Sequence, residues 1–236
     1  MNFIMTGALV NFFAVIIGSF IGLLFKKGIT QKVSDTVMKG AALCVLVIGI
    51  SGAIKTENII VAILSIVVGA IIGELIDLDK WVTRLGERIE KGVGSGHGNV
   101  TQGFVTSTLL FCVGAMSVLG PLESGLKNVH TTQIIKSVLD FVSSIIYASS
   151  FGIGVTFSAF SVLAFQGGLT LLARWVSPIM TEAVVGEMSA VGSILIIGLA
   201  LNLLGVTKMK IMNYLPAVFL SVAFYYLYDF VVTLLA

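Results

Sequence analysis

Lys136 and Asp140 are two charged residues in an otherwise apolar stretch of the sequence, from about Gln133 to Ser150. Residues four apart share one face of a helix, so a lysine and an aspartate at this spacing can neutralise each other. Inside a bilayer an ionisable residue costs roughly 2.5–3.5 kcal/mol on insertion scales, which makes it a functional-site hypothesis. The pair therefore predicts a path for a solute or an ion rather than a catalytic centre.

Further polar residues lie where they could complete such a site. Ser137 and Ser144 fall on or beside the helix face that carries the pair. Asn11 and Gln166 interrupt two other apolar stretches, and Asp229 lies several residues inside the last one. We predict that the following residues bind a substrate or an ion: Lys136, Asp140, Gln166, Ser137, Ser144, Asn11 and Asp229.

Each of these residues also has a structural explanation. Lys136 could extend its ammonium group to the outer headgroups, which would leave the pair at the membrane interface. Buried amides such as Asn11 and Gln166 often join helices by hydrogen bonds. Asp229 lies among tyrosines, which are typical of the aromatic belt at a membrane surface. The sequence alone leaves both interpretations open.

The composition is that of a membrane protein. Of the 236 residues, 57% are hydrophobic and only 11% are charged, and the mean hydropathy is +1.06. Soluble domains carry about 25% charged residues, so most of this chain must face lipid or other buried helices. A net charge of +2 is too small to predict nucleic-acid binding. Cys44 and Cys112 lie in apolar runs, which argues against a disulfide framework.

Eight apolar stretches are long enough to be membrane-spanning helices, and we predict an all-α integral membrane protein with one domain over residues 1–236. The stretches cover residues 4–25, 36–54, 59–76, 102–120, 133–150, 153–175, 187–205 and 213–235. Gly114, Gly120 and Pro121 favour a broken or kinked helix in the fourth stretch. Only a few residues separate the fifth from the sixth, so either of these could be broken or re-entrant.

The basic residues favour one orientation. With the N-terminus outside, ten of the fourteen Lys and Arg residues fall on the cytoplasmic side, as the positive-inside rule requires. Eight spans then place the C-terminus outside as well. Residues 78–100 form a cytoplasmic connection, in which apolar residues recur at helical spacing before a glycine-rich linker. We predict an interfacial helix there, and a solvated connector helix is the alternative.

The chain also contains an internal repeat. FAVIIGSFIGLLFKKG, from Phe13, resembles SVLAFQGGLTLLARWV, from Ser161, at an offset of 148 residues. The similarity extends over residues 4–77 and 153–229, so the first to third spans correspond to the sixth to eighth. Because five spans separate the copies, they would face opposite ways, as in many secondary transporters. Chance similarity between apolar, glycine-rich helices is the alternative.

Signatures of catalysis and of metal binding are missing from the sequence. No phosphate-binding loop, HExxH or GxSxG motif occurs. His97 and His130 lie in connections, and His97 has no second ligand nearby. Cys112 and Met116 are soft ligands one turn apart, but two residues are weak evidence for Cu(I). We therefore expect no enzymatic activity, no cofactor and no bound metal.

Four segments resemble the uncharacterised bacterial YqgA/YdfK membrane-protein family, a domain of unknown function. They are GALVNFFAVIIGSFIGLLFKKGI, VGAIIGELIDLDKWVTRLG, FCVGAMSVLGPLESGL and KSVLDFVSSIIYASSFGIGVTFSAFSVLAFQGGLTLLA. The resemblance covers essentially the whole chain and implies a multi-pass protein of the bacterial cytoplasmic (inner) membrane. It supplies no substrate and no functional residues. It does direct attention to Glu74, Asp77, Gly152 and Gly154, besides the pair and Gln166.

Together these features predict a secondary transporter or a channel-like permease for a small solute or ion. The alternative is a membrane scaffold or sensor subunit that transports nothing. We expect the lipid bilayer and a small solute or ion as partners, and no nucleic acid; a homo-oligomer stays open. The surroundings of Asp140 discriminate between the two functions, because a transporter needs a polar cavity there and a scaffold would enclose the residue in a salt bridge.

Overall fold

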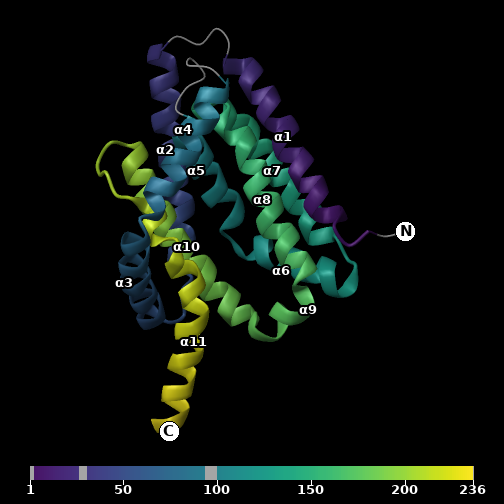
Figure 1. Ribbon diagram of the computed structural model, residues 1–236, viewed down its shortest axis with the longest axis vertical. Coiled ribbons are helices and arrows are strands. Elements are labelled where there is room, and N and C mark those ends of the chain that lie inside the picture. Colours follow the sequence, from purple (N-terminus) through teal and green to yellow (C-terminus); the bar gives the residue numbers. More distant parts are fainter. Residues whose placement is uncertain (1–2, 27–30, 94–99, 236) are drawn as a thin grey trace. The chain divides into compact units, whose positions relative to one another are not determined.

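A computed structural model describes residues 3–26, 31–93 and 100–235, and over these residues the protein is all-helical (Figure 1). His97 and the rest of the glycine-rich linker lie outside the described residues. The helices are α1 (Thr6–Lys26), α2 (Gln31–Ala53), α3 (Ile59–Ile76), α4 (Leu78–Val93), α5 (Val100–Cys112), α6 (Ala115–Lys127), α7 (Thr131–Phe151), α8 (Gly154–Leu171), α9 (Ala173–Val176), α10 (Glu182–Leu203) and α11 (Pro216–Leu235), with two 3-10 turns, η1 (Ser177–Ile179) and η2 (Ile211–Tyr214).

All eight predicted stretches fall on helices. Six helices of the described chain are long and apolar enough to cross a membrane: α1, α3, α7, α8, α10 and α11. The bent pair α5–α6 brings the number to as many as seven, and the apolar part of α2, Met38–Ala53, is shorter than a full span. The membrane character predicted from composition therefore agrees with the helices, whereas the number eight and the inverted repeat stay predictions.

Contacts divide the chain into two compact units that alternate along the sequence. The first unit contains α1, α5, most of α6, α7 and α8, together with the first part of α2 and most of α4. The second unit contains the rest of α2 with α3, α10 and α11. A helix, α4, occupies the segment for which an interfacial helix was predicted.

Glycines on α1 set the packing inside the first unit, where α1, α7 and α8 lie side by side (Figure 1). A Cβ atom on Gly7 would overlap the side chain of Gln133. One on Gly18 would overlap the Ser144 hydroxyl and the Phe141 carbonyl. The absence of these Cβ atoms lets the two backbones approach closely, which is how small residues join membrane helices. This approach brings polar groups of α1 within hydrogen-bonding reach of α7.

Two alanine substitutions should separate the effect of this contact from that of helix propensity. We expect Gly18→Ala to destabilise the protein by about 1–3 kcal/mol, because the new methyl group meets a backbone carbonyl that cannot move away. Gly168→Ala on α8 meets no atom within 4 Å of its Cβ and should stabilise the helix by up to about 1 kcal/mol. Thermal unfolding of both variants in detergent measures the difference. Equal shifts in the same direction would contradict the assigned contact.

The predicted break in the fourth span occurs at Gly114, where α5 ends and α6 begins. The φ angle of Gly114 is +132°, a backbone conformation that residues other than glycine rarely adopt. The axes of α5 and α6 are bent by 59° at this point. Pro121, which the sequence also suggested as a breaking point, lies inside α6. Between α7 and α8, Gly152 has a φ of +86°, and the helices form a hairpin. Gly154 then starts α8 in close contact with the carbonyl of Val100 on α5.

Close helix contacts also hold the second unit together. Gly69 and Gly73 on α3 face Ala217 of α11 and the backbone of Asn213, so α3 and α11 run in opposite directions. A small core of Ala62, Val191 and Ala217 joins α3, α10 and α11. Many large apolar side chains of α3 and α11 are exposed, as expected of helices that face lipid, whereas α10 is mostly buried.

Candidate functional site

The centre of the first unit contains a buried polar network from three helices. Lys136 and Asp140 form an ion pair on α7, with Nζ 2.8 Å from Oδ1 and 2.6 Å from Oδ2. Nδ2 of Asn11, on α1, donates to Asp140 Oδ2 at 2.9 Å and to Oε1 of Gln166, on α8, at 3.1 Å. Each charged residue is 6% exposed, and both amides are fully buried. Four of the residues predicted from sequence thus meet at one place.

The amides of the network have unused hydrogen-bonding atoms. Among the described residues, Asn11 Oδ1, Gln166 Nε2 and Gln133 Nε2 are buried without a hydrogen-bond partner. Exchanging the oxygen and nitrogen of Asn11 would place an oxygen against the Asp140 carboxylate, so its orientation is set by its partners. Buried polar groups are almost always paired, and exceptions call for an explanation such as a bound ligand. The network therefore offers one free acceptor and two free donors.

The network continues along α7 toward the start of that helix. Gln133 is fully buried one turn before Lys136, and its Oε1 accepts a hydrogen bond of 2.6 Å from the Ser124 hydroxyl on α6. Ser124 lies 3.1 Å from Nδ1 of His130, which precedes α7. Polar groups thus occur from the start of α7 to Asp140. Asp140 is the tenth of the 21 residues of α7, which is about 14 Å along the helix axis.

The remaining predicted residues take other positions. Ser137 and Ser144 are buried on the face of the pair, but their hydroxyls bond to carbonyls of their own helix, those of Gln133 and Phe141. Asp229 belongs to the second unit, where it is exposed on α11. Ser137 and Ser144 therefore line the network without joining it through their hydroxyls.

The network supplies charge and hydrogen-bonding groups. An ammonium, a carboxylate and three amides provide the kinds of contact that hold a polar ligand. Over the described part of the chain, no group of three or more His, Cys, Asp and Glu side chains could hold a metal ion.

Sequence reasoning missed two polar residues. Gln133 lies three positions before Lys136, and this helical spacing could have identified it. Glu187, on α10, is 2% exposed and accepts three hydrogen bonds at the start of α3: from the Thr56 hydroxyl at 2.7 Å and from the backbone N–H groups of Glu57 and Asn58 at 2.7 and 3.0 Å. It joins two helices of the second unit. No spacing in the sequence links Glu187 to those donors, which lie about 130 positions earlier.

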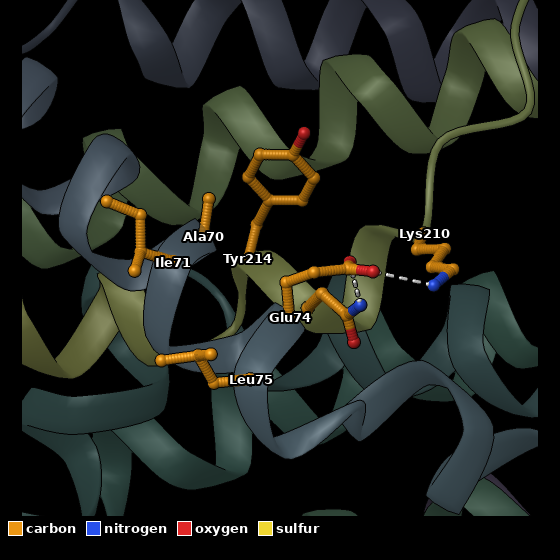
Figure 2. A pocket seen from close by; sticks show the side chains of 7 residues that line it. Ala70, Ile71, Glu74, Leu75, Lys210 and Tyr214 are labelled. Carbon is orange, nitrogen blue, oxygen red and sulfur yellow. Dashed lines mark hydrogen bonds and ion pairs between the residues drawn. The ribbon is translucent and has the colours of Figure 1, made fainter.

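A pocket of about 550 Å³ lies in the second unit, where α3 ends beside η2 (Figure 2). Its polar end is Glu74, whose carboxylate accepts from Lys210 Nζ at 2.8 Å and from Asn213 Nδ2 at 2.6 Å, and its apolar side includes Ile71 and Leu75. The hydrogen bond to Glu74 raises the pKa of Lys210 above its usual value. Glu74, although largely exposed, thus joins the end of α3 to residues 210–213.

Asn213 should contribute more to the stability of the protein than the Lys210–Glu74 ion pair beside it. Besides holding Glu74, its Oδ1 accepts from the N–H of Asp79 at 2.7 Å, and the residue is 1% exposed. We expect Asn213→Ala to destabilise the protein by about 1–3 kcal/mol, because two partly buried hydrogen bonds are lost. Lys210→Ala breaks an exposed pair and should change stability much less. Thermal unfolding in detergent compares the two, and an equal loss would contradict the assignment.

Comparison with known proteins gives the family. The family model described as "Protein of unknown function (DUF554)" matches residues 6–226. The chain is 32% identical over 217 residues to "Uncharacterized membrane protein YdfK" of Bacillus subtilis (strain 168), with 90% of this chain and 92% of that protein covered. It is 28% identical over 220 residues to "Uncharacterized protein YqgA" of Escherichia coli (strain K12), with 91% and 94% covered. No solved structure matches it. The chain therefore belongs to the DUF554 family of membrane proteins of unknown function.

Proposed function

We propose that the protein is a secondary transporter or channel-like permease that moves a small solute or ion across the bacterial cytoplasmic membrane. The observation that carries this proposal is the network of Asn11, Lys136, Asp140 and Gln166, which lies halfway along α7 and has unpartnered amide atoms. Ionisable residues at such a depth are costly and typically mark substrate or ion pathways. The protein catalyses no chemical reaction in this proposal.

Helix directions in the first unit support the predicted topology. α1 and α7 run parallel, because Gly7 faces Gln133 near the start of α7 and Gly22 faces Ala148 near its end. α8 runs the other way, since Gly167 near its end contacts Met5 at the start of α1. The N-terminus and the end of α8 are thus on one side of the bilayer. Crossings by α10 and α11 would return the chain to that side.

The bent pair α5–α6 behaves as one crossing in the proposed topology. α5 begins beside the start of α8, where Gly154 contacts Val100, and α6 lies beside the other end of α8, where Gly125 contacts Thr170. The pair therefore extends along the full length of α8, which supports a broken span rather than a re-entrant loop. With α2 as a further crossing, the total is eight.

A pair of reporters tests this topology. We expect a reporter fused to the C-terminus to be extracytoplasmic and one inserted in the linker, residues 95–99, to be cytoplasmic, because of the distribution of Lys and Arg. Alkaline phosphatase and green fluorescent protein fusions read the two sides. The opposite pair of signals would overturn the orientation. Reporters on the same side would overturn the odd number of crossings after the linker.

Contacts between equivalent helices support the inverted repeat. The repeat equates α1 with α8, α2 with α10 and α3 with α11, and each of these pairs is in contact and antiparallel, as copies of opposite orientation require. Phe12 and Phe160, 148 positions apart like the copies themselves, pack edge to face with ring centroids 5.2 Å apart. Equivalent residues meet in this way beside a two-fold axis. Such repeats permit alternating access around a central site.

The enclosed ion pair favours the second candidate function, a scaffold or sensor subunit. Lys136 and Asp140 are nearly buried and neutralise each other, which is the arrangement expected where no solute enters. A packed scaffold gains nothing from three unpartnered amide atoms, however, because each costs about 1–3 kcal/mol. This cost is the reason for preferring a binding site that is closed in this conformation.

Reconstitution tests the proposed function. Purified protein in liposomes is exposed to a panel of small polar solutes and salts, and light scattering follows the osmotic response. We expect at least one solute to enter faster than in empty liposomes, and Asp140→Asn to abolish this entry. Glu57→Gln, a change at an exposed residue, should leave it unchanged. Permeation equal to that of empty liposomes over the whole panel would favour the scaffold.

A further inference from the structure

The ion pair restricts which ligands the network can accept. Lys136 and Asp140 are the two charges of the described network, so it is neutral overall, and each charge has the other as its counter-ion. A ligand that approaches Asp140 must displace the ammonium, and one that approaches Lys136 must displace the carboxylate. A buried charge left without a partner is strongly unfavourable. The ligand must therefore replace both partners at once.

Only one class of small ligand meets this condition. A simple cation would pair with Asp140 and leave Lys136 without a counter-ion, and a simple anion would do the reverse. A neutral polar solute would have to separate the pair without offering a charge to either member. A zwitterion places its own cation on Asp140 and its own anion on Lys136, so two ion pairs replace one and the site stays neutral.

The unpartnered amide atoms offer hydrogen bonds to both charged groups of a zwitterion. Asn11, which holds Asp140 through Nδ2, has its Oδ1 free to accept an N–H of a bound ammonium group. Gln133 lies one helical turn before Lys136, and its free Nε2 can donate to a carboxylate; Gln166 Nε2 is a second free donor. The free acceptor thus belongs to the amide that is bonded to Asp140, and Gln133 provides a free donor one helical turn before Lys136.

We propose that the network binds a small zwitterion of the α-amino acid class, with its ammonium on Asp140 and Asn11 and its carboxylate on Lys136 and Gln133. This proposal names the solute of the proposed function and rests on the same site. Lys136 has a flexible four-carbon stem, so it can withdraw while Asn11 keeps Asp140 in place. Since both charged residues are 6% exposed, the enclosed site favours a ligand with a small side chain.

Alanine and its two halves test the proposal on the unmodified protein. Titration calorimetry of the full chain in detergent compares L-alanine with ethylamine, which lacks the carboxylate, and with propionate, which lacks the ammonium. We expect L-alanine or glycine to bind, and each half-molecule to bind about 100-fold more weakly or worse, because it leaves one buried charge unpaired. Equal binding of alanine and either half, or no binding of alanine, glycine or serine, would overturn the proposal.

Charge variants provide a signature that a purely structural pair would not show. Asp140→Asn frees Lys136 and should improve propionate binding at the expense of alanine, whereas Lys136→Met should improve ethylamine binding. The double variant should fold and bind none of the three, and the exposed changes Lys55→Gln and Glu57→Gln should bind alanine as the parent does. Loss of alanine binding in either exposed variant, or its retention in the double variant, would contradict the assignment.

The outcome separates this proposal from the proposed function. Alanine that binds in detergent but does not enter liposomes would preserve the zwitterion site and overturn transport. Entry of another solute, blocked by Asp140→Asn, without any binding of the amino acids would preserve transport and overturn the zwitterion.

Discussion

Removing one member of the Lys136–Asp140 pair should damage the protein more than removing both. We expect Asp140→Ala or Lys136→Ala alone to lower stability by about 3–5 kcal/mol, because the remaining charge stays buried without its counter-ion. The double variant should recover much of this loss, since it leaves no charge behind. Folded yield and thermal unfolding in detergent compare the parent, the two single variants and the double variant.

Whether the effects of the two single substitutions are additive shows whether the pair is buried or lies at the membrane interface. If Lys136 instead extended to the headgroups, each single change would act at a hydrated surface and the effects would be small and additive. Two single variants as stable as the parent would therefore contradict the buried arrangement. Lys210→Ala, which breaks the exposed pair with Glu74, is a matched control for which we expect little loss.

Glu187→Ala should also cause a large loss of stability. The substitution leaves the Thr56 hydroxyl and the N–H groups of Glu57 and Asn58 without their acceptor at the start of α3, and we expect a loss of about 2–4 kcal/mol. Glu187→Gln should be nearly neutral. Both N–H groups bond to Oε1, which glutamine retains, and the Thr56 hydroxyl can turn to accept from the new amide.

The comparison of Glu187→Gln with Glu187→Ala separates hydrogen bonding from charge. Thermal unfolding should show the loss in the alanine variant alone. If glutamine destabilises the protein as much as alanine does, the negative charge of Glu187 is what matters, and the bonds assigned to it do not explain its burial.

Much of the candidate site follows from local patterns in the sequence. Polar residues such as Asn11 and Gln166 are conspicuous inside apolar stretches, and the spacing of Lys136 and Asp140 places them on one helix face. Their meeting depends on which helices are neighbours. The pattern Gly18-x-x-x-Gly22 indicates a close helix contact but does not name its partner, which is α7.

Residues near helix ends were harder to recognise from sequence. Gln133 and Glu187 lie within the first two turns of α7 and α10, where polar side chains commonly face water, so composition gave no reason to expect their burial. Their roles come from donors on other segments. The break at Gly114 illustrates the same limit, because three breaking residues were visible and only the backbone conformation selects among them.

Solvent access to the network is the central claim, and the reactivity of a cysteine at position 137 tests it most directly. Ser137→Cys conserves shape on the buried face beside the pair, in a background with Cys44 and Cys112 replaced by serine. Ala148→Cys, equally buried but packed against Gly22, is the control. With a membrane-impermeant thiol reagent on intact cells, we expect the cysteine at position 137 to react and the one at position 148 to stay unmodified. A cysteine at position 137 as unreactive as that at 148, in a protein that reacts once unfolded, would contradict the account.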